Sequence, residues 1–252
     1  MEWYHYLIAL IGAFIAGSIN TIAGNGSVIT LSILTELVGL PGNIANGTNR
    51  IGVLFNGAGG TWGFLSMGKL RLKGTRPIMI AVIAGALAGG YIAIRISDAQ
   101  FMTIFKYLMI GMLVVTLVRP SRWLIETKMV SVVPEWITYL VYFILGVYGG
   151  VIQMGMGIFF LAAMVLMTRY PIMEANAIKV FIVTIYTVLM VLMFHYRGMV
   201  EWPIGALMGV GQFAGGWLTA RTASKIAGIN RIAYYFLLAI ILLSIASLFH
   251  IV

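Results

Sequence analysis

Apolar stretches about as long as a membrane is thick recur along the whole chain, and this repetition limits the fold more than any other feature. The composition agrees, because 61% of the 252 residues are hydrophobic and only 9% are charged, unlike soluble globular domains. The sequence therefore predicts an all-α integral membrane protein. Eight full spans are expected near residues 5–22, 43–66, 77–96, 100–118, 135–152, 172–195, 202–222 and 231–250.

The polar joints between the spans are short, and none is long enough to fold as a soluble domain. We therefore expect residues 1–252 to form a single membrane transport domain. The net charge of +9 resides mainly in these joints, which is a topology signal rather than a sign of nucleic-acid binding. The absence of cysteine excludes disulfides and thiolate metal sites.

Two further apolar runs, residues 27–40 and 158–169, are too short to cross a bilayer. A 14-residue helix covers roughly 21 Å, whereas the hydrocarbon core is about 30 Å thick. Each run follows a glycine-rich break, "AGNGS" at 23–27 and "QMGMG" at 153–157, where the backbone can leave helical geometry. These runs are predicted to be short, glycine-broken helical segments.

The two halves of the chain match each other at an offset of about 130 residues, which indicates an internal repeat. The segment "GALAGGYIAIR" at 85–95 recurs as "GQFAGGWLTAR" at 211–221. Repeat one spans about 5–118 and repeat two about 135–250. With four full spans and one short segment in each repeat, the odd number of segments inverts the second repeat. The Gly-Gly pairs at 89–90 and 215–216 are expected to let helices pack closely.

The distribution of charge supports the inverted arrangement. The basic loop 69–76, the connection 119–135 and the joint 221–231 then share one side of the membrane. The opposite side receives the balanced joints 95–98 and 197–201. The positive-inside rule predicts an inner-membrane protein with cytoplasmic basic loops and both termini outside. Four crossings per half would remove most of this asymmetry.

Arg50 and Lys179 each lie about seven residues, or roughly 10 Å, inside the start of a span. They occupy matching places in the two repeats, within one residue. A buried cation costs between about 2.5 and 17 kcal/mol unless it is paired or hydrated. Glu174 is poorly spaced to pair with Lys179. Snorkelling of the charge toward the headgroups is the alternative, but this depth favours a cavity.

Amide and hydroxyl side chains lie beside both cations. Asn46, Thr48 and Asn49 accompany the arginine, and Asn176 accompanies the lysine. Hydrogen-bonding groups that converge with two cations on a hydrated cavity suit an oxyanion. These residues are therefore candidate substrate ligands.

The glycine breaks are candidate parts of the same site, because the helices expected to start at Ser27 and Ile158 would present positive amino-terminal dipoles. Paired broken segments in two inverted halves are typical of a transporter's binding site. The alternative is that the glycines only permit tight helix packing. The candidate residues in the breaks are Gly24, Asn25, Gly26, Gly155 and Gly157.

Five segments taken together carry a resemblance to a known family: "AGSINTIAGNGSVITLSIL", "GLPGNIANGTNRIG", "GVYGGVIQMGMGIF", "EANAIKVF" and "GQFAGGWLTAR". With these segments the sequence resembles the sulfite exporter TauE/SafE family, also called the 4-toluene sulfonate uptake permeases. The resemblance covers nearly the whole chain, although the family usually has a fuller glycine run where this chain has "GNGS". It implies secondary transport of small sulfur-containing anions such as sulfite or organosulfonates.

The leading functional hypothesis is a secondary anion transporter that works by alternating access, and an anion channel is the alternative. The chain has no HExxH or GxSxG motif and no ATP-binding loop, so it is not expected to be an enzyme or to use a cofactor. The expected partners are a small oxyanion or sulfonate and the lipid bilayer. A homodimer is an open alternative.

Overall fold

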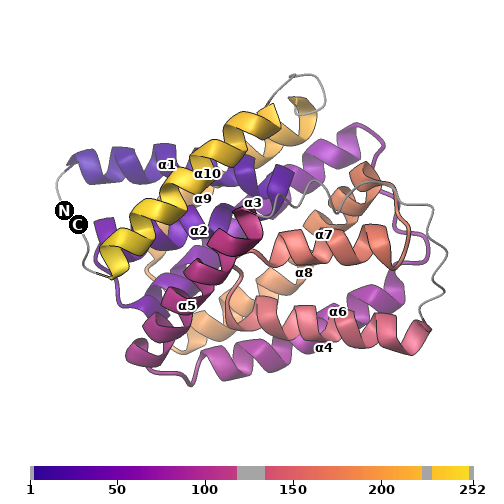
Figure 1. The fold of residues 1–252 in the computed structure, drawn as a ribbon, viewed down its shortest axis with the longest axis horizontal. Helices are drawn as coiled ribbons and strands as arrows, with labels where there is room; N and C mark the ends of the chain where they lie inside the picture. The colour runs from indigo at the N-terminus through magenta and orange to yellow at the C-terminus, as the bar shows by residue number, and fades with distance from the viewer. Residues whose placement is uncertain (1–2, 118–133, 223–228, 250–252) are drawn as a thin grey trace.

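The computed structural model describes residues 3–117, 134–222 and 229–249, and these residues form an all-helical bundle without strands (Figure 1). The expected spans appear as helices whose ends lie within about three residues of the predicted ones. The helices are α1 (Trp3–Ala23), α2 (Gly26–Ser32), the π-helix η1 (Ile33–Leu37), α3 (Gly42–Ser66), α4 (Arg76–Ala93), α5 (Asp98–Leu117), α6 (Glu135–Val151), α7 (Met156–Leu166), α8 (Ile172–Tyr196), α9 (Trp202–Thr222) and α10 (Ile229–Leu248).

Four of the helices are long and apolar enough to cross a membrane on those grounds alone. They are Trp3–Thr21 of α1 and the whole of α4, α5 and α8. Helix α3 is 25 residues long but contains buried asparagines and an arginine, which lower its hydropathy. The connection 119–133 and Lys225, which contribute to the predicted orientation, lie outside the described residues.

Proline begins corresponding helices in the two halves. Pro41 and Pro171 stand immediately before α3 and α8, with ψ angles of 140° and 142°. Pro77 and Pro203 are the second residues of α4 and α9, where a missing N–H costs no helical hydrogen bond. The same residue type therefore fixes the same helix starts in both halves.

Helices of one half of the chain pack against helices of the other half. Helix α1 packs against α9, and α6 packs against α4, so the first helix of each half contacts the fourth helix of the other. Helices α3 and α8 pack together between these pairs, and α5 packs with α10. The contacts α1–α9 and α4–α6 are equivalent, because α6 and α9 occupy the places in the second half that α1 and α4 occupy in the first.

The helix pairs α1–α9 and α4–α6 pack closely because glycine lies at their contacts. A methyl group added at Gly89 of α4 would lie 2.1 Å from the carbonyl oxygen of Val147 in α6. A methyl group at Gly215 of α9 would lie 2.1 Å from the carbonyl oxygen of Phe14 in α1. The expectation of close helix packing at both Gly-Gly pairs is confirmed.

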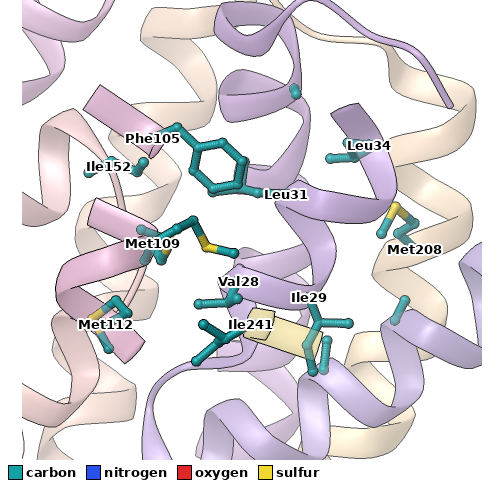
Figure 2. Packing of buried hydrophobic residues seen from close by; sticks show 14 of the residues in the cluster. Val28, Ile29, Leu31, Leu34, Phe105, Met109, Met112, Ile152, Met208 and Ile241 are labelled. Carbon is teal, nitrogen blue, oxygen red and sulfur yellow. The ribbon is translucent and has the colours of Figure 1, made fainter. Parts of the chain in front are cut away.

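The short helix α2 is buried on every side, and all seven of its residues are buried. Figure 2 shows Val28 and Leu31 of α2 beside Phe105 and Met109 of α5, all within one apolar cluster. The packing therefore holds a helix that is too short to span the membrane inside the bundle, where it positions the glycine break that precedes it.

Candidate functional site

The two glycine breaks meet in the middle of the molecule. Gly24 and Gly155 have φ angles of 75° and 72°, a left-handed conformation that favours glycine. A methyl group added at Gly24 would lie 2.5 Å from Cα of Gly157, and one added at Gly157 would lie 2.5 Å from Cα of Gly24. Backbone from one half therefore rests directly on backbone from the other, which no larger residue would allow.

Each break is followed by a helix whose amino terminus has no side-chain cap. Helix α2 begins at Gly26, one residue before the predicted start at Ser27. Helix α7 begins at Met156, two residues before the predicted start at Ile158. Gly26 faces α1, where an added methyl group would lie 2.0 Å from the carbonyl oxygen of Ala16. The first residues of α7, in contrast, line a cavity.

This central cavity lies where the breaks meet. Its water-accessible volume is about 20 Å³, which is room for about one ordered water molecule. Amide groups, glycine backbone and one lysine line it together with apolar side chains. The lining residues are Asn20, Gly24, Val53, Asn56, Gly57, Gln153, Met156, Gly157, Lys179, Val180 and Val183.

Lys179 provides the cation of the cavity. Its side chain is 2% exposed, and among the described residues Nζ has no hydrogen-bond partner. An unpaired buried ammonium costs several kcal/mol, so this residue is held in an unfavourable environment by the packing around it. An anion in the cavity would remove that cost.

Arg50 lies in a very different environment although it is also fully buried. Its Nη1 donates to the carbonyl oxygen of Gly149 at 2.6 Å, and its Nη2 donates to those of Gly150 at 2.9 Å and Val151 at 3.3 Å. These are the last carbonyls of α6, at the negative end of its dipole. The guanidinium therefore caps α6 and stabilises the helix end at the second break.

Arg50 is connected to the cavity through a single side chain. Its Nη1 donates to Oε1 of Gln153 at 3.1 Å, and Gln153 lines the cavity beside Lys179. Oδ1 of Asn46 accepts a further hydrogen bond from Nη2 at 3.3 Å. The hydrogen-bond network of Arg50 thus reaches the cavity lining through Gln153, but of the two predicted cations only Lys179 borders the cavity itself.

Asn46 and Asn176 make the same contact from opposite halves. Nδ2 of Asn46 donates to the carbonyl oxygen of Val151 at the end of α6, at 2.9 Å. Nδ2 of Asn176 donates to the carbonyl oxygen of Thr21 near the end of α1, at 2.8 Å. Each asparagine therefore ties α3 or α8 to the helix that precedes the other half's break.

The remaining predicted polar residues lie near the network but outside the cavity lining. Oγ1 of Thr48 accepts from the backbone N–H of Glu201 at 3.0 Å. Oδ1 of Asn49 accepts from Oγ1 of Thr30 at 2.5 Å. Asn25 is fully buried, and neither of its side-chain polar atoms has a partner among the described residues.

Three amide side chains that line the cavity are not among the residues predicted from the sequence: Asn20, Asn56 and Gln153. Nδ2 of Asn20 donates to Oδ1 of Asn56 at 2.8 Å, and Nδ2 of Asn56 donates to the carbonyl oxygen of Gly17 at 2.9 Å. Polar residues far from the ends of membrane helices are a general sign of a functional site. That sign is present at Asn56 in the middle of α3, whereas Asn20 lies near the end of α1, just before the first break.

A bundle of membrane helices in which two broken segments meet at a buried, cation-lined cavity has the architecture of a membrane transporter. The model of the family described as sulfite exporter TauE/SafE matches residues 9–247. The chain belongs to this family, which places it among membrane transporters rather than enzymes.

A curated relative agrees with this assignment. The chain is 30% identical over 221 residues to the "Probable membrane transporter protein ORF9" of Sinorhizobium sp. The match covers 87% of this chain and 84% of the relative. No solved structure matches the chain significantly.

Proposed function

We propose that the chain is a secondary transporter that carries a small sulfur oxyanion, sulfite or an organosulfonate, across the inner membrane. The observation that carries this proposal is the side-chain nitrogen of Lys179, buried without a partner among the described residues in the cavity where the breaks meet. The family description supplies sulfite, and the residues supply the preference for an anion.

Lys179 is the principal anchor of the anion in this proposal. The amide groups of Asn56 and Gln153 complete the site from α3 and from the second break, and the amino terminus of α7 adds its positive dipole. Arg50 acts through Gln153, whose Oε1 it holds. The other polar residues near the network, Asn25, Asn46, Thr48, Asn49 and Asn176, fix the helices that carry these ligands.

The inverted repeat gives this site a route to alternating access. In such transporters one half rocks against the other around a fixed central site. The contact between Gly24 and Gly157 is a suitable pivot because it contains backbone only. The small volume of the cavity favours a carrier over a channel, since a channel requires a continuous pore. Large unitary currents in a planar bilayer would favour the channel instead.

The proposal is tested by anion uptake into proteoliposomes. Radiolabelled sulfite, sulfate, thiosulfate, methanesulfonate and acetate are compared, and acetate is the carboxylate control. We expect uptake of at least one sulfur oxyanion by the native chain, and a loss of about 100-fold or more in the Lys179→Met variant, because an interaction with a buried charge is removed.

Lys69→Met is the matched control, since it makes the same chemical change on an exposed loop. This control should transport as the native chain does. If no sulfur anion in the panel is taken up, or if Lys179→Met transports normally, the proposal is wrong.

A further inference from the structure

No acidic residue in the described part of the chain is paired with Lys179, whose Nζ has no partner there. The five acidic residues of that part all lie at or near helix ends. They are Glu36, Asp98, Glu135, Glu174 and Glu201. Glu174 is five residues before Lys179, a rise of about 7.5 Å along the helix.

The elements that pack against α8 supply no anion either. These elements are α1, α3, α4 and α7. Among the described residues, α7 has no titratable side chain, and the groups on the others are cationic, histidine or tyrosine. The groups on the packed elements and on α8 itself are Tyr4, His5 and Tyr6 of α1, Arg50 of α3, Arg76 and Tyr91 of α4, and Glu174, Tyr186, His195 and Tyr196 of α8.

Arg50 and Lys179 therefore differ in whether the side chain can release its proton. A guanidinium does not release its proton in proteins, and that of Arg50 is stabilised by the carbonyls of α6. A lysine amine loses its proton readily when it is buried without a partner. The empty site is most stable with Lys179 neutral, and the occupied site is most stable with an ammonium paired to the anion.

We propose that Lys179 takes up one proton with each anion, which makes the chain a proton–anion symporter. This inference rests on the proposed function and names its coupling ion. The lone pair of Nζ accepts a proton from a hydronium ion on the open side, so that an O–H bond breaks, an N–H bond forms and a water molecule is left, and the ammonium binds the anion. No electron is transferred. Anion and proton leave together on the other side, and the amine returns neutral.

The coupling follows from the cost of an unpaired charge in the cavity. An anion without the proton, or a proton without the anion, leaves a net charge in a site of low dielectric constant. The empty and the fully loaded sites avoid that charge. Only these two forms are expected to reorient between the two sides of the membrane. The proton and the anion must then cross together in the same direction.

The experiment measures proton movement together with anion uptake. Proteoliposomes contain a pH-sensitive dye, and valinomycin with equal potassium on both sides holds the membrane potential at zero. Methanesulfonate is the first probe and ethanesulfonate the second, because both are monoanions of strong acids and carry no proton themselves. We expect the interior to acidify as methanesulfonate enters, with about one proton per anion.

A variant and a binding measurement make the test specific to Lys179. Lys179→Arg keeps a cation but cannot release its proton, so any uptake that remains should occur without acidification. Calorimetry of methanesulfonate binding in buffers of different ionisation enthalpy should show proton uptake by the native chain and none by this variant.

The outcomes separate this inference from the function on which it rests. Uptake by the native chain without acidification would overturn the symport and leave anion transport intact. Proton uptake that persists in Lys179→Arg would also overturn it, because another group would then hold the proton. If neither these probes nor the other sulfur anions enter, anion transport itself is wrong and the symport fails with it.

Discussion

The two buried cations differ in what surrounds them, and this difference separates stability from function at the scale of single residues. Arg50 holds three carbonyls at the end of α6, so its charge is used within the protein. Lys179 has no partner among the described residues, and its side-chain nitrogen is the group that we propose holds the ligand. Two residues at matching places in the sequence therefore have different surroundings.

Thermal unfolding of purified variants in detergent should show this difference. Arg50→Met leaves the carbonyls of Gly149 and Gly150 buried without this donor, while Asn46 still donates to Val151, and we expect a loss of roughly 1–3 kcal/mol for each carbonyl. Lys179→Met replaces an unpaired buried amine by an apolar side chain, and its stability should be unchanged or higher. Equal losses in the two variants would contradict the distinction.

The sequence predicts which residues are buried cations but not what they contact. The partners of Arg50 are backbone carbonyls about one hundred positions along the chain, and a carbonyl has no side-chain signature. Asn46 and Asn176 could be recognised as polar residues inside spans for the same reason as Arg50. Their shared role of holding the opposite half's first helix appears only when the halves are packed together.

At the scale of helices, the pattern of apolar residues together with the positions of proline and glycine is sufficient to predict almost every helix. Apolar length gives the long helices, proline gives the starts of α3 and α8, and glycine breaks give the short α2 and α7. The start of α7 is two residues earlier than expected because the left-handed Gly155 already allows the helix to begin. The pairing of α1 with α9 was not predicted, since hydropathy contains no information about partners.

Close packing between α4 and α6 leads to a second prediction. Gly89→Ala places a methyl group 2.1 Å from the carbonyl oxygen of Val147, and we expect a loss of about 1–3 kcal/mol from overpacking. Gly111→Ala makes the same change in α5, where nothing lies within 4 Å. This control should be neutral or more stable by up to about 1 kcal/mol.

Thermal unfolding in detergent measures both glycine variants. Equal effects would mean that the contact between α4 and α6 yields more easily than its backbone geometry indicates. A loss in the Gly89 variant alone would confirm that the missing side chain, rather than helix propensity, is the reason for glycine at this position.

At the scale of the whole molecule, the inverted arrangement expected from the sequence predicts which loops share a side of the membrane. The chain has no native cysteine, so single cysteines introduced at exposed positions report their own accessibility. We expect Lys73→Cys to react with an impermeant maleimide only from the cytoplasm and Arg197→Cys only from outside.

Intact cells and inverted vesicles provide the two sides for this measurement. Both variants should transport normally, because both residues are exposed and lie outside the cavity lining. Labelling of both positions from the same side would contradict the inverted arrangement and the positive-inside assignment together.

The exchange of partners between the halves affects how the protein is made. Helix α1 leaves the ribosome well before α9, yet the glycine face that it packs against belongs to α9. During synthesis α1 must therefore wait in the membrane with that contact open, while α4 meets α6 soon after α6 is inserted. Long delays between synthesis and pairing expose a nascent chain to misassembly. The last helices of this transporter thus complete the environment of its first, and a chain that stops after α8 is expected to remain a target for membrane quality control.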